Sequence, residues 1–185
     1  FLEDTMLIKI KPDTYAFLGI TVLFLIGSLF HFLYSISGEL FVVGLFTPVN
    51  ESIFEHTKMV VFPIFLWWSL FYLFRKDNLD TNKWFMAALL SMLTSIISIP
   101  MLYYFYTEAF GVQSLVVDVL ILLVAVGCGQ LLGLHYYQYG KGIDYRLALG
   151  LMVFIIMLFA FLTIFTPKLP LFQDSIDRSY GIRKS

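Results

Sequence analysis

The sequence predicts an all-α membrane protein, a bundle of about five transmembrane helices with a short re-entrant or interfacial segment before the second helix. Hydrophobic residues make up 59% of the 185 positions and aromatic residues 18%, while only 14% are charged. An ordinary soluble domain has roughly 25% charged residues. Five apolar runs are also long enough to cross a bilayer, which takes about 20 helical residues. A water-soluble monomer is therefore excluded.

The five runs are predicted to be helices because they are apolar on every side. They show neither the one-sided stripe of a soluble helix nor the alternation of a barrel strand. Two of them contain prolines, Pro63 and Pro100, which membrane helices tolerate when neighbouring groups bond the freed carbonyls. The predicted spans are residues 15–36, 53–74, 84–106, 113–137 and 147–165.

Two local features indicate how the spans pack. Residues 38–47, between the first two spans, are apolar but too few to cross a bilayer, so we expect a re-entrant or interfacial segment. In the fourth span, Ala125, Gly129 and Gly133 form a ridge of small residues that allows close helix packing. We expect this ridge to serve packing within the bundle rather than dimerisation.

Lysine and arginine flank the spans unevenly, which predicts an orientation. With the N-terminus inside, the outer loops carry only Lys58 before the C-terminal tail. The inner side holds Lys9, Lys11, Arg75, Lys76, Lys83, Lys141 and Arg146. We therefore predict a multi-pass protein of the cell membrane with a cytoplasmic N-terminus. Residues 166–185 are then an extracytoplasmic tail, which we expect to fold over the bundle end that bears Glu51 and His56.

Charge and cysteine content exclude several classes of protein. The net charge of −1 argues against a nucleic-acid partner, which needs a basic face. The single cysteine, Cys128, excludes an internal disulfide framework and a cysteine-based zinc site. A lipid bilayer is the expected surrounding, and a membrane-protein partner or a homo-oligomer stays open. The first residues are too charged for a signal peptide. Because the sequence begins with Phe1 rather than Met, we expect either that further residues precede it or that the natural start is Met6.

Ionisable side chains within the spans are rare, which makes each a functional hypothesis. His31 and Asp118 each lie five residues from the same end of the bundle, a depth of about 7–8 Å. Glu51 and His56 enter from that same end. His135 lies about 33 Å further along its helix than Gln113, at the opposite surface.

These positions predict one polar site at the outer end of the bundle. The predicted acids, bases or ligands are His31, Glu51, Glu55, His56 and Asp118. We expect Lys58 and Asn50 to contact a substrate, because an ammonium and an amide bind phosphate or carboxylate oxygens. A divalent metal, should the site use one, is expected on His56, Glu55 and Asp118, although their spacing matches no well-attested metal motif.

A purely structural interpretation of the same segment is also open. Thr47 followed by Pro48 suits a helix N-terminus, and Ser52 with Glu55 fits a capping box. Capping alone does not explain why Glu51, His56 and Lys58 occur together with His31 and Asp118 at a matching depth. A buried network that only satisfies its own polar groups is the alternative to a functional site.

Several stretches resemble a known family. Residues 45–58 contain the string Pro-Val-Asn-Glu-Ser-x-x-Glu-His-x-Lys, and residues 27–34, 169–174 and 180–182 carry further similarity. Together they resemble a family of small bacterial integral membrane proteins of unknown function. The resemblance implies a location in a bacterial cell membrane. It implies no activity, because the family has none assigned.

Three functions are compatible with these features. The first is a membrane-embedded enzyme, or a ligand- or metal-binding protein, that acts on a lipid-like substrate through the polar site. The second is an accessory or structural subunit of a membrane complex. The third is a transporter of a small cation or solute, against which the polar groups gather at one side. The sequence has no nucleophile elbow, H-E-x-x-H, C-x-x-C or phosphate loop.

Overall fold

Five long helices make up most of the protein in the computed structural model, which describes residues 10–182. The described chain contains no strand, only an isolated bridge between Gln173 and Tyr180. All five helices are long and apolar enough to cross a membrane. The predicted all-helical class is therefore confirmed. Lys9, Met6 and the last tail residues lie outside the described part.

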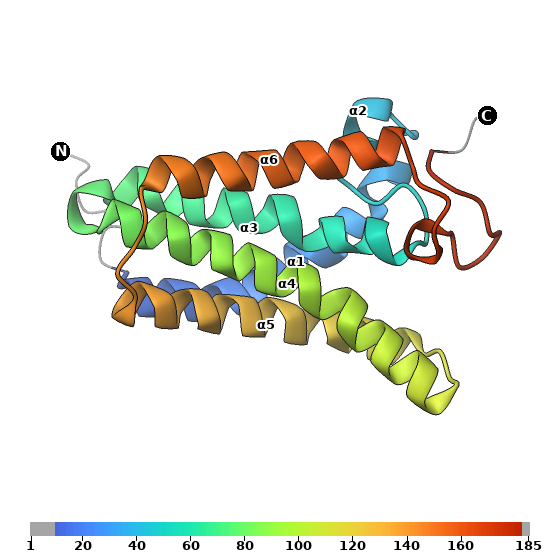
Figure 1. The fold of residues 1–185 in the computed structure, drawn as a ribbon, viewed down its shortest axis with the longest axis horizontal. Helices are drawn as coiled ribbons and strands as arrows, with labels where there is room; N and C mark the ends of the chain where they lie inside the picture. The colour runs from blue at the N-terminus through green and yellow to red at the C-terminus, as the bar shows by residue number, and fades with distance from the viewer. Residues whose placement is uncertain (1–9, 183–185) are drawn as a thin grey trace.

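The helices run up and down a single bundle (Figure 1). Their bounds are α1 Pro12–Ile36, α2 Phe41–Gly44, α3 Ile53–Arg75, α4 Thr81–Phe110, α5 Leu115–Tyr139 and α6 Tyr145–Ile164, with short 3-10 turns η2 Lys76–Asn78 and η3 Pro170–Phe172. The short α2 lies in the segment predicted to be interfacial. Its Phe41 and Val42 are exposed apolar side chains, as in a segment that contacts lipid.

Side chains in the connecting loops determine where three of the helices begin. The Ser52 hydroxyl accepts from the Glu55 backbone N–H, and the Asp80 and Asp144 carboxylates play the same role for α4 and α6. Such caps satisfy backbone donors that lack a helical partner. Because α3 begins at Ile53, a helix start at Thr47 and Pro48 is wrong.

Close packing of α5 against α4 depends on the small-residue ridge. A Cβ on Gly129 would clash with Ser95 and would lie 2.6 Å from the Ser91 carbonyl, and one on Gly133 would lie 2.8 Å from the Ala87 carbonyl. No side chain fits at these two positions, so the ridge lies against α4. It serves packing within the bundle, as expected.

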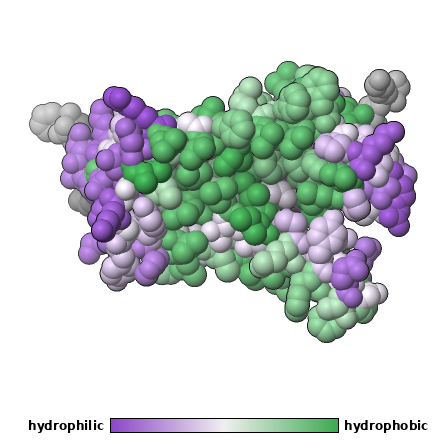
Figure 2. Space-filling view, viewed as in Figure 1, coloured by the Kyte–Doolittle hydropathy of each residue, from purple (hydrophilic) through white to green (hydrophobic). Residues whose placement is uncertain are grey.

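Polar and apolar residues divide the surface into zones. Figure 2 shows hydrophilic residues at the two ends and a continuous hydrophobic band between them. At one end, the start of α3 and the end of α6 lie beside the C-terminal segment, while α4 and α5 extend together away from α3 and α6 (Figure 1). The candidate site lies at this end.

Candidate functional site

The polar side chains around the start of α3 point in two directions. Glu51 precedes the helix, whereas Glu55 and His56 lie in its first turn. Consecutive helical residues point about 100° apart, so Glu55 and His56 cannot face one neighbour. The string Asn-Glu-Ser-x-x-Glu-His-x-Lys therefore supplies two separate clusters.

Glu55 and Lys58 form the first cluster, a buried ion pair. The Lys58 Nζ lies 2.7 Å from Glu55 Oε2, and both side chains are 2% exposed. Lys58 also donates to the carbonyls of Gly44 and Thr47 at 2.8 and 3.3 Å. Glu55 accepts from the Val49 N–H at 3.1 Å. These bonds fix the 44–50 loop onto α3.

The remaining oxygen of Glu55 accepts from the Thr163 hydroxyl of α6 at 3.1 Å. Glu55 was predicted as a metal ligand and Lys58 as a substrate contact. The structure instead surrounds both with protein partners. A fully bonded pair of this kind holds elements together, because leaving either charge alone in the interior is costly.

Asn50, the other predicted substrate contact, bonds within the protein too. Its amide nitrogen donates to the Gly181 carbonyl at 3.1 Å, and its oxygen accepts from the Ser52 N–H at 2.9 Å. The side chain thereby joins the start of α3 to the C-terminal segment.

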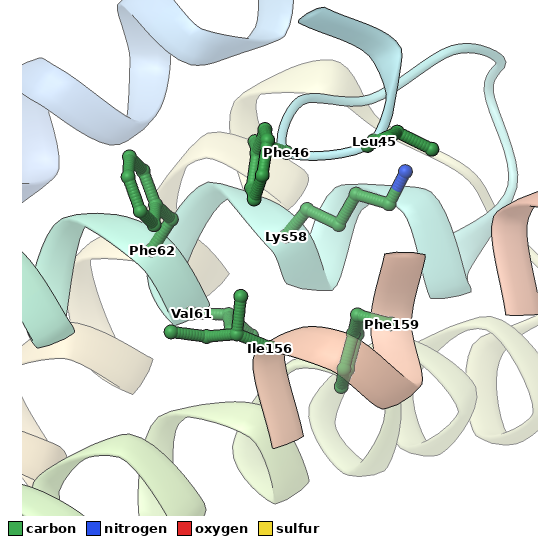
Figure 3. A pocket seen from close by; sticks show the side chains of 7 residues that line it. All are labelled: Leu45, Phe46, Lys58, Val61, Phe62, Ile156 and Phe159. Carbon is green, nitrogen blue, oxygen red and sulfur yellow. The ribbon is translucent and has the colours of Figure 1, made fainter. Parts of the chain in front are cut away.

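A small cavity lies beside the ion pair, between α3, α6 and the segment that carries Leu45 and Phe46. Figure 3 shows Lys58 extending from α3 toward that segment, among apolar side chains. The cavity volume is about 10 Å³, which is room for about one water molecule. It is too small for an organic ligand, whose sites take about 300–1,000 Å³.

His31, Glu51 and His56 form the second cluster. Glu51 Oε1 lies 3.7 Å from His31 Nε2, and Glu51 Oε2 lies 3.4 Å from His56 Nε2. The two imidazole rings stack with centroids 5.1 Å apart. One ligand atom from each residue lies within 4.8 Å of the others, which makes the three a candidate metal-ion group.

A hydrogen bond fixes the tautomer of His56. Its Nδ1 lies 2.9 Å from the Ser52 carbonyl oxygen, and a carbonyl only accepts, so Nδ1 carries the proton. In the neutral ring, the lone pair is then on Nε2, which faces Glu51. Metal-ligating histidines almost always donate their other N–H to a carbonyl or carboxylate in this way.

His31 reaches the cluster because α1 and α3 approach closely one turn earlier. A Cβ on Gly27 would lie 2.9 Å from the Met59 carbonyl oxygen, so only glycine allows this contact without a shift. His31 Nδ1 is buried and has no hydrogen-bond partner among the described residues. No hydrogen bond at Nδ1 therefore fixes which ring nitrogen of His31 carries the proton, and a ligand at Nε2 can determine it.

Glu51 carries the negative charge of the cluster. When His56 also carries a proton on Nε2, its hydrogen bond to Glu51 is the largest cause that lowers the pKa of Glu51 below its ordinary value, and attraction to both imidazoles adds to it. Burial opposes the shift, but less strongly. With its side chain 38% exposed, the carboxylate is ionised and within reach of a solute.

Asp118, on α5, does not belong to the cluster. It lies within electrostatic range of His56, and its Oδ1 accepts from the Tyr106 hydroxyl at 2.6 Å. His135 lies at the far end of α5 beside Tyr139, away from the other two histidines.

The fold and this site define an all-helical bundle of five long apolar helices with a histidine–carboxylate cluster at one end. Residues 6–182 match a family of unknown function (DUF6512), so the chain belongs to that family. No curated protein and no solved structure matches it. The predicted membership of a family without an assigned function is thus confirmed.

Proposed function

We propose that this chain is a multi-pass membrane metalloprotein that binds one divalent transition-metal ion through His31, Glu51 and His56. The observation that carries the proposal is the convergence of three donor atoms within 4.8 Å, from two helices and the loop between them. Two imidazoles and one carboxylate form a donor set suited to Zn²⁺, Fe²⁺ and similar ions.

A divalent cation can replace protons in this cluster. Without one, His56 must carry a second proton, on Nε2, to donate to Glu51, because its Nδ1 proton is already bonded to the Ser52 carbonyl; the neutral tautomer of His31 can donate from its own Nε2. A cation instead binds both Nε2 lone pairs and the carboxylate at once, and both rings stay neutral.

Three protein ligands leave a coordination position for water or substrate, the pattern of catalytic rather than structural zinc sites. With an ion bound, these three residues would hold a Lewis acid that can polarise an oxygen-bearing group or activate a water. Leu29 and Phe32, on either side of His31 in α1, are exposed apolar side chains, so the site borders the surface that lipid would cover. This favours a lipid-like substrate at the outer leaflet of the membrane.

A site at one face is favoured over a path through the bundle. The buried charged side chains of the described residues are Glu55, Lys58 and Asp174, which all belong to the end that carries the cluster. A cation transporter needs charged groups at further depths, whereas the buried polar side chains found there, such as Ser91, Ser95 and Gln130, are neutral. In the proposed orientation, the lysines and arginines of the opposite end face the cytoplasm.

Metal content of the purified protein tests the proposal. We expect about one Zn²⁺ or Co²⁺ per chain after loading and desalting in detergent, and loss of the ion in His56→Ala. His135→Ala is the matched control, because it removes a histidine of the same bundle outside the cluster. Absence of metal from the wild-type chain, or equal loss in both variants, would contradict the proposal.

A further inference from the structure

The C-terminal segment of the described chain forms hydrogen bonds with the backbone of Glu51, the residue that supplies the carboxylate of the cluster. Asp174 Oδ2 accepts from the backbone N–H of Glu51 at 3.1 Å. The Ser175 N–H donates to the Glu51 carbonyl at 3.4 Å. Both backbone polar groups of Glu51 are thus bonded to a segment more than 120 residues further along the chain.

Asp174 is built into this contact. It is 1% exposed, and its other oxygen accepts from the backbone N–H groups of Ile176 and Asp177 at 2.7 and 3.2 Å. One carboxylate therefore closes the turn of the tail and holds the loop before α3. An amide in its place has one acceptor oxygen instead of two.

The tail is itself seated on the bundle. The ring of Phe172 packs against Phe54 of α3 at 4.4 Å between centroids, and Phe54 stacks on Phe159 of α6 at 4.8 Å. Gly181 has a φ of 67°, which glycine adopts without strain. Its carbonyl is the one that Asn50 binds.

We propose that Asp174 is a positioning residue for the metal site, which it serves by fixing Glu51 from the tail. His31 and His56 stand on long helices and are placed by them. Glu51 stands outside any helix, so its position depends on loop contacts. Ligand geometry must hold to within about 0.5 Å for tight binding. This role rests on the proposed metal site.

The experiment measures Co²⁺ affinity of the full chain in detergent for the wild type, Asp174→Asn, Glu51→Gln and the double variant. We expect Asp174→Asn to weaken binding about tenfold, as loss of a group that orients a ligand does. We expect no further weakening when Glu51→Gln is already present, because the effect acts through Glu51. Asp144→Asn changes an aspartate cap at the opposite end of the bundle. This variant should bind Co²⁺ with the affinity of the wild type.

The outcomes distinguish the positioning role of Asp174 from the metal site itself. Unchanged affinity in Asp174→Asn, or equal weakening with and without Glu51→Gln, overturns the positioning role and leaves the metal site standing. A wild-type chain that binds no Co²⁺ overturns both. Should Asp174→Asn fail to fold, Gly181→Ala displaces the tail independently, because its Cβ would lie 2.6 Å from the Thr166 hydroxyl. It should weaken binding in the same Glu51-dependent way, and normal affinity would overturn the role.

Discussion

His31 and His56 come from different helices and stack their imidazole rings at 5.1 Å, with the Glu51 carboxylate facing the Nε2 atom of each. Neither histidine is fully exposed or fully buried, since their side chains are 25% and 28% accessible. The arrangement joins α1, the loop before α3 and α3 itself at one point.

Gly27→Ala should weaken both the fold and metal binding. The new methyl group meets the Met59 carbonyl at 2.9 Å and pushes α1 from α3, an overpacking cost of about 1–3 kcal/mol. His31 then moves away from His56, and we expect Co²⁺ affinity to fall several-fold. Gly127→Ala is the control, since its Cβ would meet nothing within 4 Å. Equal affinities in the two variants would show that the approach of α1 is irrelevant to the site.

Removal of one partner of the Glu55–Lys58 pair should destabilise the bundle. Lys58→Met leaves the Glu55 carboxylate buried without its cation, which typically costs about 3–5 kcal/mol. In Glu55→Gln with Lys58→Met no charge is left, so we expect the double variant to lose less than the sum of the single variants. Unfolding in a denaturing detergent mixture gives the four free energies. Additive losses would mean that the two charges do not interact.

Stability of the metal-free protein should depend on the Glu51 carboxyl in acid. Its pKa is lowered in the folded state, chiefly by the hydrogen bond with His56, from an ordinary value of 4.5. A group with a lowered folded pKa contributes stability above its unfolded pKa and loses it as the pH falls through the folded pKa.

Thermal unfolding with a chelator present measures this contribution as the difference between the wild type and Glu51→Gln. We expect the difference in stability between the two proteins to have its full size just above about pH 4.5 and to shrink below it. It should be modest, because the side chain is 38% exposed and solvent screens it. A difference that does not shrink as the pH falls below about 4.5 would contradict the ion pairing of Glu51 with the histidines.

Composition was sufficient to predict the helical class. A run of about 20 apolar residues without a one-sided stripe has few stable alternatives to a helix surrounded by lipid or protein. The structure contains five such helices. Helix bounds were less accessible, because they depend on local bonds: α4 extends from Thr81 to Phe110, past the residues 84–106 expected from hydropathy alone.

The site was harder to predict, because a shift of a few positions along the chain decides whether a side chain joins the metal cluster or the buried ion pair. Glu51 and Glu55 look equivalent in the sequence, yet the helix start at Ile53 leaves the first in a loop and turns the second into the interior. The match in depth between His31 and the start of α3 could be counted from the sequence. The contact of Asp174 with Glu51 spans 123 residues, and no local pattern reports such a pairing.

The most direct test of the metal site is anomalous X-ray scattering from crystals of the full chain grown with Zn²⁺. Data collected on both sides of the zinc absorption edge locate the ion without reference to activity. We expect one strong peak between His31 Nε2, the Glu51 carboxylate and His56 Nε2, at about 2.0–2.2 Å from each ligand atom. Absence of a peak there, or a peak bound elsewhere while these three residues keep their contacts, would contradict it.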